Sequence, residues 1–292
     1  MPSLTRRSFL RIGTGLAAAA VTVDAALLEP NRPRLVELDL PLRRLSQAWS
    51  GLRVAQLSDF HYDHIFSVVA LRKAVDLLAQ VRPDLIVLTG DFITAPLFSH
   101  NERSRRRAAA AIGPCSEYLK RLHAPEGIFA CLGNHDGFSD PTYITATLQT
   151  CGIHVLRNSS VALERQGTRL WLAGVQDVLE EDPDLDLALR GIPESDAVIL
   201  LAHEPDFAED VARHRVDLQL SGHSHGGQVR IPFFGAPVLP EMAKKFPMGL
   251  YRIGGLTLYT NAGLGTVRVP VRFDCPPEVT LFTLRSAPAG NS

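Results

Sequence analysis

The stretch PDLIVLTGD, residues 83–91, contains an uninterrupted apolar run that stops at Gly90 and Asp91. A strand without polar alternation is typical of a parallel sheet that is covered on both faces. Residues at the carboxyl ends of such strands gather along one edge of the sheet, where ligands bind in open α/β folds. The stretch therefore predicts a buried strand that brings Asp91 to a binding edge.

The same sequence of apolar strand and polar loop recurs elsewhere in the chain. It is found in LRVAQLSDFH (52–61), EGIFACLGNHD (126–136) and DAVILLAHEPD (196–206). After the first of these strands, VVALRKAVDLLAQV (68–81) repeats apolar residues at helical spacing. Strands that alternate with helices, followed by a strand-rich second half, predict an α/β fold with at least one mixed sheet. Further strands are expected in HVLRNSSVAL (154–163) and GQVRIP (227–232) among others.

The bulk composition describes a globular chain. It has 292 residues, 46% hydrophobic and 21% charged, with a formal net charge of -1. Near-neutral charge gives no reason to expect nucleic acid as a partner. The four cysteines form no CxxC pair and no zinc-ribbon spacing, so they are expected to be small buried side chains.

The N-terminus resembles a twin-arginine export signal. TRRSFLRIG (5–13) places two arginines before Ser-Phe-Leu, and a weakly hydrophobic, alanine-rich run follows over residues 12–28. This resemblance implies export by the twin-arginine machinery to the periplasm or the outer face of the cytoplasmic membrane. The run is marginal in length for a permanent membrane span. A retained anchor and an ordinary amphipathic helix with a basic start both stay open.

The chain is divided into four parts by this pattern. Residues 1–28 are the signal or anchor, and residues 29–50 are a connector in which LVELDLPL (35–42) is expected to form an edge strand. Residues 51–285 are predicted to be one catalytic domain, and residues 286–292 a frayed tail.

Several segments have open roles. The arginine cluster at 103–107 is expected to be a solvated helix face. The insert at 96–110 and the loop FFGAPVLPEMAKKFPM (233–248) are expected to rim the cleft, and the second of these leaves contact with a membrane surface or an acyl chain open. Arg268 and Arg272 are expected to be solvated at a sheet edge, with a grip on phosphate as the alternative.

Polar side chains stand at five predicted strand exits. They are Asp59, His61, Asp91, Asn134, His135, Asp136, His203, His223 and His225. Each residue alone has an ordinary interpretation as a turn former or surface residue, but together they predict a metal site. Imidazole nitrogen and carboxylate oxygen jointly suit manganese, iron or zinc.

A pair of divalent ions explains this set of residues. Two ions about 3.5–4 Å apart share a carboxylate, and Asp91 is the natural bridge because it is the lone acid in its loop. Such ions lower the pKa of bound water, so a bridging hydroxide would attack a bound phosphate ester. His135 is placed to protonate the leaving oxygen. Asp136 either orients that imidazole or caps the turn.

Five blocks of the sequence resemble the signature of the calcineurin-like metallophosphoesterases. They are DFH (59–61), GD (90–91), GNHD (133–136), the histidine of AHEP (202–205) and GHSH (222–225). The resemblance implies a two-sheet mixed β-sandwich flanked by helices. It also implies that one metal binds Asp59, His61 and His225, that Asp91 bridges, and that Asn134, His203 and His223 hold the second metal.

The resemblance implies hydrolysis of phosphodiesters or phosphomonoesters, on a small-molecule or lipid substrate, by a monomer. Where the protein-phosphatase branch has Asp and Arg, GDFITAP (90–96) has Thr94 and Ala95, which favours the smaller bacterial phosphoesterases. The C-terminal third is similar to an exported or membrane-associated bacterial subgroup. Some relatives there cleave the pyrophosphate of a UDP-diacylglucosamine lipid precursor, so a lipid-linked pyrophosphatase is one alternative. A non-enzymatic metal-binding envelope protein is the other.

Overall fold

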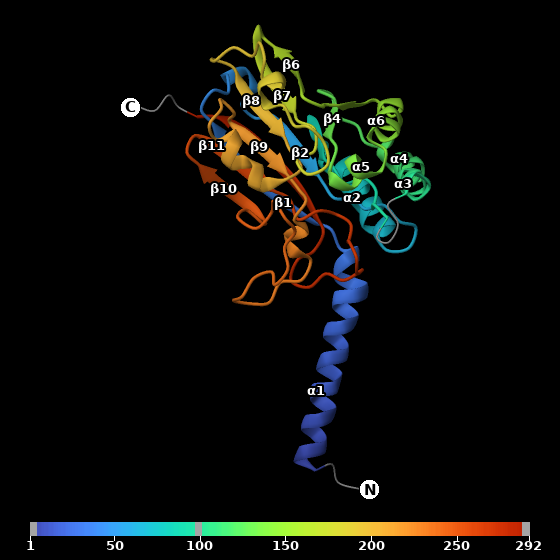
Figure 1. The fold of residues 1–292 in the computed structure, drawn as a ribbon. Coiled ribbons are helices and arrows are strands. Elements are labelled where there is room, and N and C mark those ends of the chain that lie inside the picture. Colours follow the sequence, from blue (N-terminus) through green and yellow to red (C-terminus); the bar gives the residue numbers. More distant parts are fainter. Residues whose placement is uncertain (1–4, 97–100, 288–292) are drawn as a thin grey trace.

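The computed structural model describes residues 5–96 and 101–287 (Figure 1). Most of the predicted tail and residues 97–100 of the predicted cleft insert lie outside the described residues. The helices are α1 Arg6–Val23, α2 Ser67–Val81, α3 Glu102–Ala109, α4 Ile112–Leu119, α5 Asn134–Ser139, α6 Pro141–Thr150, α7 Leu185–Ala188 and α8 Ala208–Val211. The short helical turns are η1 Asp24–Leu28, η2 Glu29–Asn31, η3 Gln47–Trp49, η4 Pro205–Phe207 and η5 His225–Gly227.

The strands form two mixed six-stranded sheets. The first sheet has the order β1-β12-β2-β3-β4-β5 and the second β10-β11-β9-β8-β7-β6. In the first sheet the strands are β1 Arg34–Leu42, β2 Arg53–Leu57, β3 Leu85–Thr89, β4 Ile128–Cys131, β5 Ile153–Val155 and β12 Glu278–Ser286. In the second they are β6 Ser159–Arg165, β7 Thr168–Gly174, β8 Ala197–Leu201, β9 Leu218–Ser221, β10 Gly249–Ile253 and β11 Leu256–Thr260.

Strands β2, β3, β4 and β5 are parallel to one another, and so are β7, β8, β9 and β11. The residues that end these strands therefore lie along one edge of the sandwich. The predicted edge strand is β1, which pairs with β12 in parallel register.

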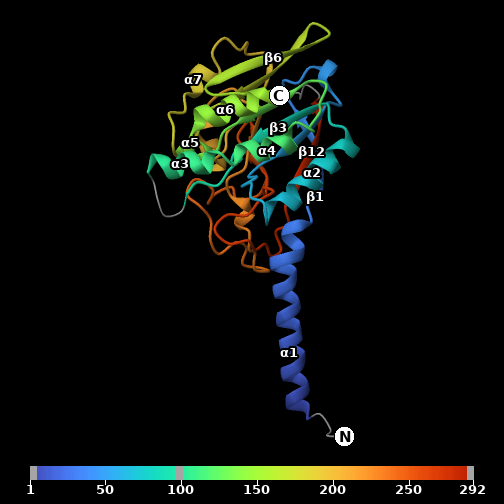
Figure 2. The same cartoon turned by 90° about the vertical axis from the view of Figure 1, so that its right-hand side faces the viewer.

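Alternate residues of the central strands build separate cores. Leu85 and Val87 of β3 face the second sheet, whereas Ile86 and Leu88 pack against the helices α2, α4 and α6. On β8, Ile199 faces the first sheet, whereas Val198 and Leu200 pack under α7 and α8. The result is a four-layer sandwich with helices outside both sheets, as Figure 2 shows for the first sheet. The fold is therefore the predicted one, and the apolar run of β3 is explained by burial on both faces.

Two expected strands differ in the structure. Residues 154–163 are not one strand, because β5 ends at Val155 and β6 begins at Ser159 in the other sheet. Asn158 takes a left-handed backbone (φ 49°) at this crossing, a conformation that asparagine tolerates. Residues 227–232 make isolated bridges instead of a strand, with Val229 paired to Phe273.

The N-terminal helix projects from the sandwich (Figures 1 and 2). Helix α1 runs without a break through η1 and η2, so Arg6–Asn31 is one helical stretch of 26 residues. This stretch is long and apolar enough to cross a membrane, and 6% of its apolar window is buried. Within the described residues, the helix has almost no contact with the sheets.

Candidate metal centre

Loops from both sheets meet at the site. The loop after β2 is tied to the loop after β3, because the amides of Asp59 and His61 donate to the carbonyls of Gly90 and Asp91 at 3.0 Å each. The loop after β9 is tied to the loop after β8, because the Gly222 amide donates to the His203 carbonyl at 3.0 Å. These backbone hydrogen bonds place the polar side chains of separate strands around one point.

Asp91 lies between two groups of imidazoles. Its Oδ2 is 3.3 Å from His61 Nε2 and 3.2 Å from His203 Nε2. Its Oδ1 accepts a hydrogen bond of 2.9 Å from the backbone amide of His135. The carboxylate is buried, and the neighbouring histidines hold its pKa well below the usual range against the opposing effect of burial. This position is the one expected of a carboxylate that bridges two cations.

The first group consists of Asp59, His61 and His225. Their ligand atoms lie within 4.8 Å of one another. His225 Nε2 is 3.3 Å from Asp59 Oδ1 and 3.0 Å from His61 Nε2. All three side chains are buried, so a cation here would be shielded from solvent.

The second group consists of Asp91, His203 and His223, whose ligand atoms also lie within 4.8 Å of one another. Asn134 joins it through its Oδ1, which is 3.1 Å from His223 Nδ1. Among the described residues, the buried His203 Nε2 has no hydrogen-bond partner although it lies beside Asp91. A buried nitrogen and a carboxylate oxygen that lie close together without a well-aligned hydrogen bond fit two ligands of the same cation.

Backbone carbonyls fix the tautomers of two of these histidines. His203 Nδ1 donates to the Thr89 carbonyl at 2.6 Å, and His223 Nε2 donates to the Glu241 carbonyl at 2.7 Å. A carbonyl only accepts, so the bonded nitrogen carries the proton of the neutral ring, and the lone pair of that ring is on the other nitrogen. Such second partners are usual for histidines that bind metals. In the neutral rings the lone pairs are therefore on His203 Nε2 and His223 Nδ1, which lie beside Asp91 and Asn134.

His135 has the opposite arrangement. Its Nδ1 accepts a hydrogen bond of 2.8 Å from the Ala95 amide, so Nε2 carries the proton of the neutral ring. Burial lowers the pKa of His135 to about 4, against the opposing charge of Asp91. The ring lines the cleft, with its centroid 4.6 Å from that of His61. His135 is therefore the imidazole that presents a proton to the cleft.

Asp136 does not orient His135 in the described structure. Its carboxylate accepts the amides of Phe92 (3.0 Å), Ile93 (3.3 Å) and Gly133 (3.1 Å). The predicted partnership with the His135 ring is therefore wrong, and the capping alternative is the one observed. Burial, assisted by the charge of Asp91, raises the pKa of Asp136 to about 8. Asp136 holds the loop after β3 against the start of α5.

Thr94 and Ala95 were recognised from the sequence only as a departure from the protein-phosphatase pattern. In the structure Thr94 Oγ1 lies 3.1 Å from His61 Nδ1, and the Ala95 amide holds His135. Both positions therefore support the site. Sequence reasoning had no signal for this, because neither residue type binds metal.

Two buried carboxyl groups were also missed. Asp177 follows β7 and Glu204 follows His203 directly, and burial raises the pKa of each. The amides of Leu179 and Glu180 donate to Asp177, and the Val178 amide donates to Glu204. The polar residues that follow these two strands, in VQD (175–177) and AHEP (202–205), are visible in the sequence. Only the structure shows that the carboxyl groups of Asp177 and Glu204 lie together.

The two candidate phosphate-binding arginines have different positions. Arg272 is fully buried and its guanidinium donates to four backbone carbonyls, those of Ala262, Gly263, Gly265 and Cys275. The expected solvation and the alternative grip on phosphate are both wrong for Arg272. Arg268 is exposed and lines the cleft.

The cleft over the metal ligands has a volume of about 640 Å³. Asp91, Asn134, His135, His223 and His225 form its polar wall. The apolar part of its lining, the apolar wall, consists of Pro237, Val238, Leu239, Pro240, Val267 and Val269. The loop 233–248 therefore rims the cleft as predicted.

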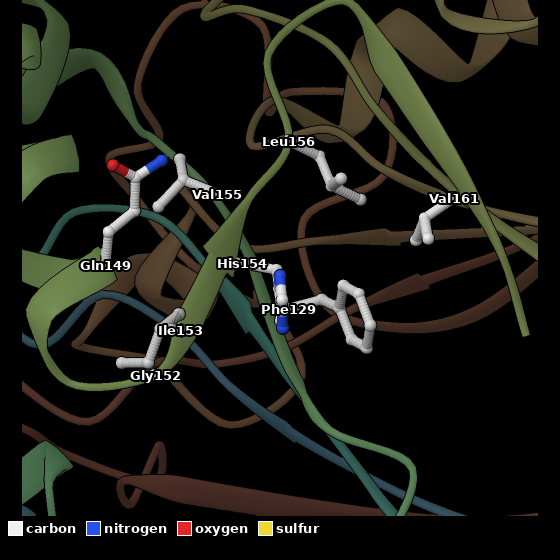
Figure 3. A pocket seen from close by; sticks show the side chains of 8 residues that line it. All are labelled: Phe129, Gln149, Gly152, Ile153, His154, Val155, Leu156 and Val161. Carbon is white, nitrogen blue, oxygen red and sulfur yellow. The ribbon is translucent and has the colours of Figure 1, made fainter.

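A second hollow, of about 340 Å³, lies beside the edge strand β5 (Figure 3). His154 is the only titratable residue among the eight that line it, and its ring stacks on Phe129 with centroids 5.1 Å apart. A single stacked imidazole offers no group for hydrolysis. The chemistry of the described residues is concentrated in the first cleft.

Comparison with known proteins agrees with this geometry. The family model of the calcineurin-like phosphoesterases matches residues 52–227. The chain is 35% identical over 98% of its length to the uncharacterized metallophosphoesterase YkuE of Bacillus subtilis strain 168, and it covers 99% of that protein. It is 31% identical over 80% of its length to phosphodiesterase YaeI of Escherichia coli K12, with 82% of that protein covered. It is 27% identical over 92% of its length to UDP-2,3-diacylglucosamine pyrophosphatase LpxG of Chlamydia trachomatis serovar D, with 94% of that protein covered.

Proposed function

Because this chain belongs to the calcineurin-like phosphoesterase family and is a metal-dependent hydrolase, we propose that it hydrolyses phosphodiesters, with phosphomonoesters as the second class, in the cleft above Asp91. The observation that carries the proposal is the shared position of Asp91 between two groups of ligands, beside an imidazole that presents a proton. Phosphate esters need both parts, since negative charge must be neutralised and a leaving oxygen protonated.

The residues present fit two divalent cations. The ligands are Asp59, His61 and His225 for one, Asn134, His203 and His223 for the other, and Asp91 for both. Mixed nitrogen and oxygen ligands suit manganese, iron or zinc. When bound, two such ions supply Lewis-acid chemistry and activate water at neutral pH.

The side chains of the chain have separate tasks in this proposal. His135 presents its Nε2–H to the leaving oxygen and stabilises the charge that develops there by a hydrogen bond, while the Ala95 amide keeps Nδ1 as an acceptor. Asp136 holds the loop that carries Asp91 against the loop that carries His135. Arg268 is the exposed cation at the cleft and orients the phosphate as the substrate enters.

A lipid-linked pyrophosphate is the second candidate substrate. The relative from Chlamydia trachomatis is named a UDP-2,3-diacylglucosamine pyrophosphatase. The observation that favours this class is the apolar wall of Val238, Leu239, Val267 and Val269, against which an acyl chain can be buried.

The test uses the purified full chain with bis(p-nitrophenyl) phosphate and p-nitrophenyl phosphate. We expect hydrolysis with manganese, iron or zinc that a chelator abolishes. Asp91→Ala should lose bound metal and activity together, because the carboxylate contacts both ligand groups. Absence of hydrolysis of either ester with any of the three metals would favour the non-enzymatic envelope protein instead.

We also propose export by the twin-arginine route, with the protein held at the outer face of the cytoplasmic membrane. Arg6, Arg7 and the exposed apolar helix that follows them support this location. Replacement of both arginines with lysine should leave the folded protein inside the cell. Unchanged fractionation of this variant would refute the route.

A further inference from the structure

We propose that the mouth of the cleft rests on a lipid bilayer, with the tip formed by residues 231–235 inserted into the interface. We define the apolar rim as Ile231, Phe233, Phe234, Val238 and Val269. The proposal extends to the substrate, which would be a phosphoester carried by a membrane lipid. That second part rests on the proposed phosphoesterase function, whereas the docking itself does not.

The tip is built to expose aromatic side chains. Residues 231–235 form a tight turn in which Ile231 and Gly235 exchange two backbone hydrogen bonds of 2.9 Å. Phe233 and Phe234 follow one another at its end, with relative exposures of 106% and 87%. Phe233 also holds a left-handed backbone (φ 70°), which is unfavourable for a bulky residue. Two fully exposed phenyl rings on a strained turn indicate a contact surface.

The other members extend this surface to the cleft. Val238 and Val269 line the cleft and are 71% and 55% exposed. The same two side chains therefore belong to the wall of the catalytic cleft and to its outer rim. An apolar chain that follows this wall would pass directly from the rim to the metal ligands.

The position of the N-terminal helix indicates that the partner of the apolar rim is a lipid bilayer. The helix enters the sandwich beside this rim, because the Arg272 amide donates to the Ala25 carbonyl at 2.9 Å. Glu29 then accepts the amides of Asp274 and Cys275, at 3.1 Å and 2.5 Å. These contacts fix the base of the helix to the segment 267–275, which includes cleft-lining residues.

The same segment reaches the tip. The Phe273 amide donates to the Gln228 carbonyl and the Arg230 amide donates to the Phe273 carbonyl, both at 2.8 Å. In both views, the loops drawn in orange and red gather at the end of the sandwich from which α1 projects (Figures 1 and 2). A bilayer crossed by α1 would therefore meet the apolar rim, and aromatic side chains are favoured at that depth.

The first experiment reads the position of the tip without enzyme activity. Phe234→Trp is compared with Tyr143→Trp, which puts the probe on an exposed aromatic position of α6. Both full-length variants are reconstituted in phosphatidylcholine–phosphatidylglycerol vesicles that contain lipid brominated near the headgroup. We expect a blue shift and quenching for Phe234→Trp that Tyr143→Trp lacks. Equal quenching of the two variants would overturn the proposal, and so would a blue shift that follows protein concentration without lipid, because it would indicate a second copy as the occupant.

The second experiment separates docking from catalysis. Phe233→Ser/Phe234→Ser should lower kcat/KM about 10-fold or more on a phosphodiester lipid in vesicles, and leave the hydrolysis of bis(p-nitrophenyl) phosphate unchanged. Tyr143→Ser should change neither rate. Equal rates of the double variant and the native chain on the lipid would overturn the assignment of the substrate. If the native chain hydrolyses neither ester, the proposed function fails, and the quenching result still decides the docking.

Discussion

At the scale of single residues, the site holds several candidate ligands in unfavourable backbone conformations. Five candidate ligands have a left-handed backbone, namely Asp59, His61, Asp91, His223 and His225, with φ between 39° and 66°. Such residues persist only where their surroundings over-determine them, and they concentrate at functional sites. Here the surroundings are the hydrogen bonds that join the loops after β2, β3 and β9. These hydrogen bonds therefore maintain the left-handed conformations, and the side chains of these loop residues face one point as a result.

His135→Ala tests the role assigned to the neutral imidazole. The variant removes the proton on Nε2 but no atom of the carboxylates or of the other histidines. We expect kcat to fall about 100-fold or more, because this is the usual contribution of a positioned proton donor. Metal content, measured by elemental analysis of the same preparation, should stay unchanged. Loss of metal from His135→Ala would instead make His135 a ligand. Its ligand atom lies within 4.8 Å of those of His61 and Asp91, so the measurement distinguishes the two roles.

At the scale of elements, the loops that carry the candidate ligands approach one another closely at glycines. A Cβ built on Gly222 would lie 2.9 Å from Ser58 Cβ, and it would collide with Ser58 Oγ and Asp59 Oδ2. Gly90 is similarly confined, since a Cβ there would lie 2.5 Å from the Gly133 amide nitrogen. The absence of a side chain at these glycines therefore allows the loops of the site to approach one another closely.

Gly222→Ala should displace Asp59 and weaken metal binding. Overpacking of this kind costs about 1–3 kcal/mol of unfolding free energy. Gly113→Ala is the matched control, because Gly113 lies in α4 with nothing within 4 Å of its built Cβ. That control should gain about 0.5–1 kcal/mol from helix propensity. Urea unfolding with and without metal measures both effects, and equal stability of the two variants would contradict the close approach.

Strand β12 carries a buried acid that makes stability depend on pH. Burial raises the pKa of Glu278, although hydrogen bonds from Thr280 and Tyr259 and the charge of Arg272 oppose this. A folded-state pKa above the unfolded value means that the folded chain binds the extra proton. The contribution to stability is therefore present at low pH, below the unfolded pKa, and is lost as the pH rises through the folded pKa.

Glu278→Gln removes this ionisation and keeps an oxygen that accepts the hydrogen bonds. We expect the variant to become more stable relative to the native chain as the pH rises from 5 to 8. Urea unfolding at both values measures the difference. Glu37→Gln, an exposed position on β1, serves as control and should show no such trend. A constant difference for Glu278→Gln across this range would mean that Glu278 is ionised in the fold throughout.

Most of the fold can be predicted from the sequence, because the spacing of apolar residues along the chain follows the pattern of burial. The apolar run 85–88 and the helical spacing 68–81 report which faces are covered, and both elements are found where expected. The crossing at Asn158 was not predictable, because a turn between two sheets and a bend within one strand look alike over so few residues. For the site, side-chain types indicate which residues can bind metal. The tautomers of His203 and His135 depend on the Thr89 carbonyl and the Ala95 amide, which carry no signal in the sequence.

At the scale of the whole molecule, the N-terminal helix and the cleft share one structural element. Glu29 at the base of the helix accepts the amides of Asp274 and Cys275. The Cys275 thiol in turn donates to the carbonyl of the candidate ligand His225, with sulfur and oxygen 3.2 Å apart. Two consecutive contacts therefore connect the base of the helix to the loop that carries His225.

Glu29→Ala tests this connection. The carboxylate bonds two amides at once, and each hydrogen bond to a charged group contributes about 1.5–3 kcal/mol. We expect the amides of Asp274 and Cys275 to exchange with deuterium roughly 10-fold faster or more, and metal affinity to fall as the loop around His225 loosens. Glu37→Ala, an exposed acid on β1, should leave exchange at residues 274–275 and metal affinity unchanged. Faster exchange without any loss of metal affinity would show that the helix base and the ligand loop move independently, and the helix would then serve for attachment alone.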